Sequence, residues 1–166
     1  MREMIERSFI IRTSWLFGPD GKNFVSTILR LAREKSELRV VNDQRGSPTY
    51  TRHLAKKLAE LVKTREYGTY HVTATGNCTW YEFARKIIEL YDLQGIRVIP
   101  ISTTECGRPA LRPSFSVLAN RRLSSLGIGL LPQWEEGLKS YLAEISDGGK
   151  CADKVIEKRP AYSTLA

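Results

Sequence analysis

The chain has 166 residues, of which 42% are hydrophobic and 27% are charged, and its formal net charge is +8. This length suits one ordinary domain with a buried core. No run approaches the roughly 18 apolar residues of a transmembrane helix, so we expect neither an integral membrane protein nor a membrane partner. Because the N-terminal segment carries charges where a signal peptide needs an apolar stretch, we expect a cytoplasmic protein.

The distribution of basic residues and cysteines argues against several kinds of partner. The positive charge is spread along the chain without a basic block or a basic–aromatic pattern, so we expect no nucleic-acid partner. Cys78, Cys106 and Cys151 lie far apart and form no CxxC pair. We therefore expect reduced, unpaired thiols, with neither a disulfide framework nor a metal site.

The first third of the chain alternates strand and helix patterns. A β-branched run predicts a strand at 8–12, and the GPDG sequence at 18–21 predicts a turn. Asn23 then caps an amphipathic helix over 24–35. A second strand is predicted at 37–41, and a loop rich in Asn, Asp, Gly and Pro follows it up to Tyr50.

The middle of the chain continues this alternation. The second predicted helix begins at Thr51, with its apolar residues, Leu61 and Val62 among them, facing the core. A third strand is predicted at 68–72. Thr79 starts a capping box, because Glu follows three residues later, and this predicts a third helix.

The last third of the chain is less regular. A fourth strand at 96–101 contains a proline near its end, which favours an edge position. Pro132 predicts the first turn of a final helix. The sequence over 147–166 has little periodicity, which predicts a flexible tail. The alternation of strands and helices indicates an α/β fold, although four short strands could form more than one sheet.

Common catalytic motifs are missing from the chain. It has no glycine-rich dinucleotide fingerprint, Walker loop, G-x-S-x-G elbow or H-E-x-x-H sequence. His71 falls within a predicted strand, which favours a structural role, and His53 suits a solvated or capping role. The residues therefore give little support for acid–base catalysis by this chain alone.

Polar segments follow the predicted strands, where open α/β folds bind ligands. They are 12–15 and 44–49, and the helix start at 22–24 offers backbone amides that suit a phosphate. Trp15 fits either stacking on a base or sugar or packing in a core, and the residues leave both open. Arg108 and Arg112 fit either a bidentate contact to a diphosphate or a solvated surface position.

Five segments in order resemble the dTDP-4-dehydrorhamnose reductases of the extended short-chain dehydrogenase/reductase superfamily. They are IIRTSWLFGPDGKNFVSTILRLA, VVNDQRGSPTYTRHLA, GTYHVTATGNCTWYEFARKI, VIPISTTECGRPALRPSFSVLANRRL and LPQWEEGLKSYL. The resemblance covers roughly Phe9 to Ile145. It implies that 1–146 is the C-terminal, substrate-binding portion of an NAD(P)-binding Rossmann-like fold whose N-terminal Rossmann half is missing.

The resemblance also implies a reaction. In the family, NADPH or NADH gives hydride to the C4 ketone of dTDP-4-dehydro-L-rhamnose, and a Tyr-x-x-x-Lys pair supplies the proton. No tyrosine of this chain has a lysine four residues later. We therefore expect no catalytic residue here, no reductase activity from this chain alone, and a missing N-terminal half or a second copy as partner.

Particular residues are implied by the same resemblance. A dTDP-sugar would be bound by Trp15 against the deoxysugar, by Lys22, Asn23 and Phe24 near the diphosphate, by Gln44 in the nucleotide pocket, and by Arg112 as an anion contact. The nicotinamide end of the cleft would be bordered by Arg12, Thr13 and Ser14.

Two positions depart from the family pattern, and one other function stays open. His53 stands where the family generally has an acidic residue, and Cys106-Gly107 replaces a commoner aromatic–Pro pair. The regulatory subunit of methionine adenosyltransferase shares this superfamily, so a non-catalytic partner-binding module is the alternative. The RTSW and QRGSPTY segments favour the reductases.

Overall fold

The computed structural model describes residues 6–107, 109–110 and 112–147. Its helices are α1 (Phe24–Glu34), α2 (Thr51–Leu61), α3 (Trp80–Leu90), α4 (Thr103–Cys106), α5 (Arg121–Ser125) and α6 (Trp134–Asp147). Its strands are β1 (Phe9–Arg12), β2 (Leu16–Phe17), β3 (Glu37–Val41), β4 (Arg45–Gly46), β5 (Thr49–Tyr50), β6 (Gly68–His71), β7 (Cys78–Thr79) and β8 (Arg97–Ile101). None of the described helices is both long and apolar enough to cross a membrane.

The four predicted strands form two separate parallel pairs. β1 pairs with β6 in the register Phe9 to Gly68, and β3 pairs with β8 in the register Glu37 to Arg97. The α/β class is confirmed, together with more than one sheet. Within the described residues β8 has only β3 beside it, which confirms the edge position that Pro100 indicates.

The segment after β3 is not the plain loop that its composition predicts. β4 pairs antiparallel with β7, and β5 pairs parallel with β2. Their partners lie elsewhere in the chain, so no local pattern shows the pairing. These short ladders anchor the polar segment that leads into α2.

Helix starts follow their local capping signals. The side-chain oxygens of Asn23 and Thr79 accept hydrogen bonds from the amides of Ser26 and Glu82, which confirms both predicted caps. Pro132 does not lie in the first turn of α6, because that helix begins two residues later. Its carbonyl instead accepts a hydrogen bond from the Thr75 amide at 3.0 Å, in a bridge between two extended segments.

The α2 helix buries a narrower face than its sequence predicts. Leu61 is fully buried, as expected, but Val62 is 61% exposed and the prediction that it faces the core is wrong. Val62 is the C-cap residue, just beyond the last helical residue. The helix has ended there and a turn follows, so its inward-facing stripe does not extend to Val62.

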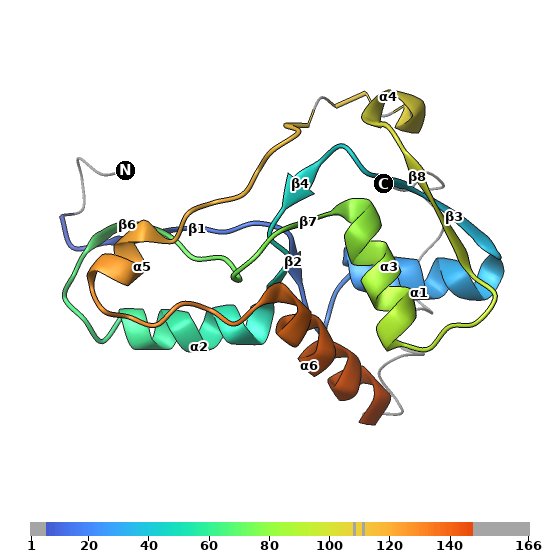
Figure 1. Cartoon of the computed structure of the whole chain (residues 1–166). Helices are drawn as coiled ribbons and strands as arrows, with labels where there is room; N and C mark the ends of the chain where they lie inside the picture. Colours follow the sequence, from blue (N-terminus) through green and yellow to red (C-terminus); the bar gives the residue numbers. More distant parts are fainter. Residues whose placement is uncertain (1–5, 108, 111, 148–166) are drawn as a thin grey trace.

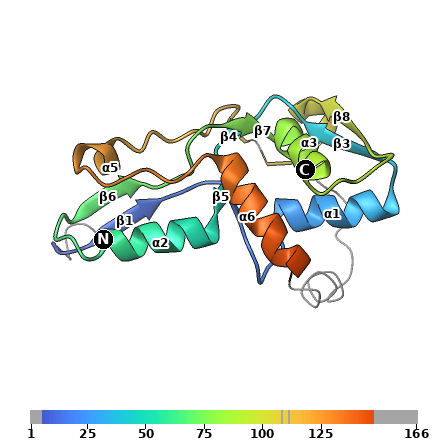
Figure 2. The same ribbon diagram turned by 60° about the horizontal axis from the view of Figure 1, so that its bottom comes forward.

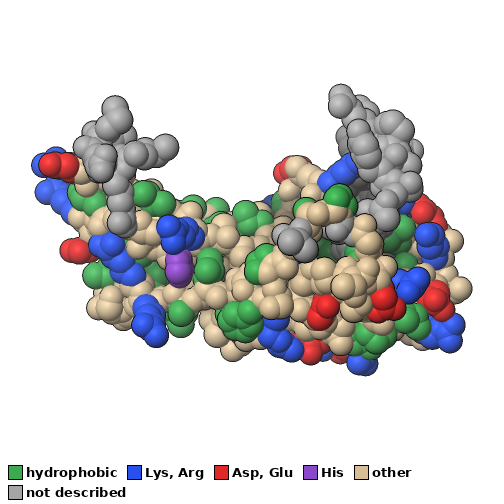
Figure 3. Space-filling model, turned by 90° about the horizontal axis from the view of Figure 1, so that it is seen from above, with side chains coloured by type: hydrophobic (Ala, Val, Ile, Leu, Met, Phe, Trp, Pro, Cys, Tyr) green, Lys and Arg blue, Asp and Glu red, His purple; other side chains and the backbone are tan. Residues whose placement is uncertain are grey.

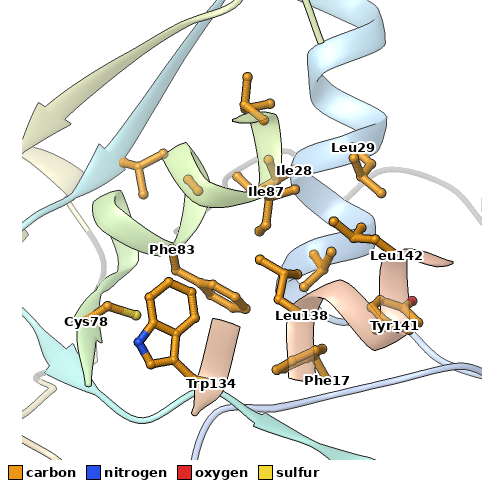
Figure 4. Packing of buried hydrophobic residues seen from close by; sticks show 14 of the residues in the cluster. Phe17, Ile28, Leu29, Cys78, Phe83, Ile87, Trp134, Leu138, Tyr141 and Leu142 are labelled. Atoms are coloured by element: carbon orange, nitrogen blue, oxygen red, sulfur yellow. The ribbon is translucent and has the colours of Figure 1, made fainter. Parts of the chain in front are cut away.

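Two buried clusters stabilise the two ends of the molecule. Figures 1 and 2 show α2, β1, β6 and α5 at one end, α1, α3, β3 and β8 at the other, and α6 between them. The larger cluster joins α1, α3 and α6, whose side chains meet around Phe83 and Leu138 (Figure 4). The smaller cluster packs Leu54 and Leu61 of α2 against Tyr70 of β6.

Charged side chains are dispersed over the face shown in Figure 3, where Lys and Arg lie at several separate places.

The predicted tail at 147–166 lies outside the described residues except for the end of α6. Cys78 and Cys106 form no disulfide, while Cys151 lies outside the described residues.

Candidate ligand-binding site

A cavity of about 290 Å³ opens between the start of α1, the end of β3, the start of α3, and α4. We call it the α1–α4 cavity. It is lined by Lys22, Asn23, Phe24, Thr27, Val41, Gln44, Trp80, Thr103, Cys106, Ala110 and Arg112. Five of the six residues that the resemblance implies for the sugar nucleotide therefore meet at one cavity, although they come from segments far apart in the sequence.

The N-terminus of α1 brings amides and a cation to this cavity. Asn23 serves the helix itself, because its Oδ1 accepts from the Ser26 amide at 3.0 Å and its Nδ2 donates to the Gly18 carbonyl at 2.8 Å. In the described part of the chain, no carboxylate pairs with Lys22 or Arg112. Both side chains are exposed and available to an anion.

Gln44 is the most deeply buried polar residue of the cavity wall, with 6% of its surface exposed. Its Nε2 donates to the Thr103 hydroxyl oxygen at 2.9 Å. The amide and hydroxyl of Thr103 both donate to Asp43, at 2.8 and 2.6 Å. These two hydrogen bonds lower the pKa of the Asp43 carboxyl below its ordinary value.

Trp15 lies behind the cavity rather than in its wall. Its ring stacks on Trp80, with centroids 3.4 Å apart and planes 6° from parallel. Gly46 lies against the indole, since a Cβ there would come within 2.3 Å of the Trp15 ring. One face of Trp15 is thus occupied by Trp80, and any ligand contact is restricted to the remaining ring surface.

The three predicted cofactor residues lie apart from the α1–α4 cavity, at the end of β1. Arg12 is exposed, and the Ser14 hydroxyl donates to the Ser47 carbonyl at 3.3 Å. The Thr13 hydroxyl is buried and has no hydrogen-bond partner among the described residues. The structure therefore separates these three residues from the five implied substrate residues that line the cavity, whereas Trp15 directly follows Ser14 in the chain.

A second, shallower hollow of about 660 Å³ lies beyond the end of β6. Asn120 forms part of its wall and holds the backbone of Thr73, accepting from its amide at 3.1 Å and donating to its carbonyl at 2.9 Å. Ser47 lines this hollow, and its carbonyl is the one that Ser14 contacts. The hollow therefore lies near the segment that follows β1.

The two histidines have structural surroundings. His71 Nδ1 lies 3.2 Å from the Ala119 carbonyl oxygen, and the His53 ring meets the Tyr50 ring edge-on. Burial, reinforced by Lys56, lowers the pKa of His53. Among the described residues no group of three His, Cys, Asp or Glu side chains could hold a metal ion.

Sequence reasoning missed six members of the cavity wall, namely Thr27, Val41, Trp80, Thr103, Cys106 and Ala110. Trp80 is the first residue of α3, so the capping box at Thr79 already indicated its place at a helix start. Thr103 follows Ser102, whose hydroxyl accepts from the Glu105 amide in another capping box, which opens α4. Arg112 is placed in the cavity wall, whereas Arg108 lies outside the described residues.

Comparison of the sequence with protein-family models identifies the family of this chain. The model described as the RmlD substrate binding domain matches residues 1–146. The chain belongs to this family. The α/β fold and the resemblance to dTDP-4-dehydrorhamnose reductases are thereby confirmed for this RmlD substrate-binding domain.

Curated relatives carry names from polysaccharide and deoxysugar metabolism. The domain is 47% identical over 140 residues to the spore coat polysaccharide biosynthesis protein SpsK of Bacillus subtilis, covering 84% of this chain and 48% of that protein. It is 38% identical over 138 residues to a dTDP-4-dehydrorhamnose reductase of Streptomyces griseus, covering 80% of this chain and 45% of that protein. The chain spans about half the length of the curated relatives it matches.

Solved structures agree with this assignment. A dTDP-4-dehydrorhamnose reductase from Bacillus anthracis in complex with NADP superposes with a TM-score of 0.80 at 46% identity, covering 82% of this chain and 48% of that one. An orthologous reductase from Clostridium acetobutylicum gives a TM-score of 0.84 at 39% identity, covering 87% of this chain and 51% of that one. The RmlD substrate-binding domain thus has the fold of the matching half of these reductases.

Proposed function

We propose that residues 1–146 form the sugar-nucleotide-binding portion of a dTDP-4-dehydrorhamnose reductase. The observation that carries this proposal is the meeting of Lys22, Phe24, Gln44 and Arg112 at the α1–α4 cavity. Lys22 and Arg112, which no described carboxylate pairs with, and the amides of the first turn of α1 suit a diphosphate. The relatives named as reductases supply the reaction to which such binding belongs.

The reaction proposed is reduction of the C4 ketone of dTDP-4-dehydro-L-rhamnose to dTDP-L-rhamnose. NADPH, when bound to the whole enzyme, supplies the hydride. This chain holds the nucleotide end, so that the ketone takes one position relative to the reductant. Positioning of this kind lowers the barrier because orientation is fixed before the reaction begins.

The residues at the end of β1 fit one edge of a cofactor site. Thr13 offers a buried hydroxyl that no described residue partners, and Arg12 offers an exposed cation. An unpartnered buried hydroxyl favours a polar group nearby. We infer that Arg12, Thr13 and Ser14 border the nicotinamide, whereas this chain contains no glycine-rich loop for the rest of the cofactor.

The sequence has no Tyr-x-x-x-Lys pair, so we predict that the chain by itself does not reduce the substrate. Incubation of the purified chain with NADPH and the ketosugar is expected to give no NADPH oxidation. Turnover above the enzyme-free rate would contradict this prediction.

An open strand edge is a candidate place for a partner. In the described part of the chain, β1 pairs on one side only, with β6. Unpaired strand edges are templates for further pairing. We infer that a Rossmann half or a second copy of this chain covers this edge; a monodisperse monomer in light scattering would contradict self-association.

Calorimetric titration with dTDP-L-rhamnose tests the binding role. The folded chain is expected to bind saturably, and Arg112→Ala is expected to weaken binding about tenfold, because a charge-assisted contact to phosphate is lost. Lys63→Ala is the matched control, since it removes one exposed positive charge far from the α1–α4 cavity. Absence of binding by a chain that is folded by circular dichroism would overturn the proposal.

A further inference from the structure

The side-chain amide of Gln44, in the wall of the α1–α4 cavity, has a hydrogen-bond partner for its nitrogen but none among the described residues for its oxygen. Gln44 is 6% exposed as a residue and its Nε2 donates to Thr103, but its Oε1 accepts no hydrogen bond from any described residue. Among the described residues only the Thr13 hydroxyl oxygen is both fully buried and unpartnered, so the Gln44 oxygen is accessible, and a ligand that covers it without donating would leave it unsatisfied. Because Gln44 lines the cavity, a donor on a ligand can complete its hydrogen bonding.

The orientation of that amide is fixed by its neighbours. Thr103 has a single hydroxyl proton, and it donates this proton to Asp43 Oδ1 at 2.6 Å. Asp43 is ionised and only accepts, and its Oδ2 takes the Thr103 amide at 2.8 Å. The Thr103 oxygen therefore offers only lone pairs to Gln44, which requires the Gln44 NH₂ to face Thr103 and its carbonyl to face the cavity.

The surroundings decide which part of a sugar nucleotide meets this carbonyl. A carbonyl oxygen repels phosphate, whereas Lys22 and Arg112 elsewhere in the wall attract it. Val41, Phe24 and Trp80 provide apolar surface for a planar ring. Gln44 therefore suits the Watson–Crick edge of a base, which proteins read by hydrogen bonding.

We propose that Asp43 and Thr103 are positioning residues that hold Gln44 as an acceptor for the ring N3–H of thymine or uracil. Cytosine carries a lone pair at N3, which would oppose the Gln44 oxygen, so the cavity rejects it. The inference rests on the proposed function, because it assumes that a nucleoside diphosphate occupies this cavity. To that function it adds the means by which the cavity selects the base, namely the fixed orientation of the Gln44 amide.

Titration of the whole chain with dTDP, dUDP and dCDP tests the selection. The expected order is dTDP and dUDP within threefold of each other, with dCDP at least about tenfold weaker, since an unmatched buried acceptor costs that much affinity. dTDP methylated at N3 is expected to bind as weakly as dCDP. Because dUDP keeps the N3–H and lacks the methyl group of thymine, comparing it with dTDP separates the contributions of these two groups to binding.

Two variants test the positioning residues. Thr103→Val removes both hydrogen bonds of the hydroxyl while keeping its shape, so the preference for dTDP over dCDP should fall below about threefold. In Asp43→Asn, the side-chain oxygen must still accept the Thr103 amide, so its NH₂ faces the Thr103 hydroxyl. The hydroxyl proton then turns to Gln44, the amide flips, and dCDP should bind more tightly than dTDP.

Asp92→Asn is the matched control, because Asp92, like Asp43, is an exposed carboxylate that accepts a side-chain hydrogen bond, here from Gln94 at 2.6 Å, and it does not line the cavity. It should leave the dTDP to dCDP ratio unchanged. A general loss of structure would weaken all nucleotides alike and would not invert their order. Equal binding of dTDP and dCDP by the wild type, or an unchanged ratio in both variants, would overturn this inference while leaving the proposed function standing. No binding of any of these nucleotides would overturn both.

Discussion

The rings of Trp15 and Trp80 stack face to face, 3.4 Å apart and 6° from parallel. This contact joins the segment after β1 to the first turn of α3. Trp15 itself adopts a left-handed backbone conformation, with φ of 49°. Because Trp80 lines the α1–α4 cavity, the wall of the cavity is backed by a second aromatic ring from a distant part of the chain.

A double-mutant cycle measures this stack. Trp15→Ala and Trp80→Ala should each destabilise the chain by about 2 to 3 kcal/mol in urea unfolding, below the range for fully buried tryptophans because both are partly exposed. The double variant should be less destabilised than the sum by about 1 kcal/mol, the worth of an aromatic pair. Strict additivity would show that the two rings stabilise the fold independently.

Gly46 should be intolerant of even one methyl group. Its Cβ would lie 2.3 Å from Cε2 of Trp15, so Gly46→Ala is expected to cost about 1 to 3 kcal/mol in unfolding free energy. In the Trp15→Ala background the cost should largely disappear, because the obstructing ring is gone. Gly21→Ala is the control, since no atom of a described residue lies within 4 Å of its Cβ position. An equal cost at both glycines would contradict the steric explanation.

Tyr50 should make stability depend on pH in the alkaline range. Its hydroxyl donates to Glu144, which also pairs with Arg52. Burial, and then Glu144, raise the pKa of Tyr50 above its ordinary value of 10.0. The folded state therefore retains the phenol proton when the unfolded chain loses it, so this stabilisation is complete below about pH 10 and declines as pH rises further.

The Tyr50→Phe variant isolates that contribution. At pH 7 it should be less stable than the wild type by about 1 kcal/mol, the usual net worth of a hydrogen bond. The difference should shrink in unfolding measurements made above about pH 10, where the wild type alone loses the bond. Tyr91→Phe serves as a control, because no described residue hydrogen-bonds to the Tyr91 hydroxyl. A difference independent of pH would exclude this role for Tyr50.

Neighbouring residues at the end of α2 should differ sharply in importance. Leu61 is fully buried, so Leu61→Ala should cost about 2 to 5 kcal/mol. Val62 is 61% exposed, and Val62→Ala should change stability by less than about 0.5 kcal/mol. Chemical unfolding of both variants measures this contrast. A large loss at Val62 would restore the inward position that its sequence pattern predicts.

The sequence by itself determined the features that local interactions specify. The caps at Asn23 and Thr79 are formed by residues three positions apart, and the main strands are read from short apolar runs. The ordered motifs also identified the family, and they named five of the eleven residues that line the α1–α4 cavity. Local spacing suffices for these because the interacting groups are neighbours in the chain.

Only the tertiary structure decided which distant groups meet. β4 and β5 exist because their partners come from other segments, and Pro132 lies outside α6 because its carbonyl pairs with Thr75. The stack of Trp15 on Trp80 and the bond from Gln44 to Thr103, 59 positions away, are of the same kind. Hydrogen bonds and ring contacts act over a few ångströms in space, so their partners are set by packing of the whole chain rather than by spacing along it.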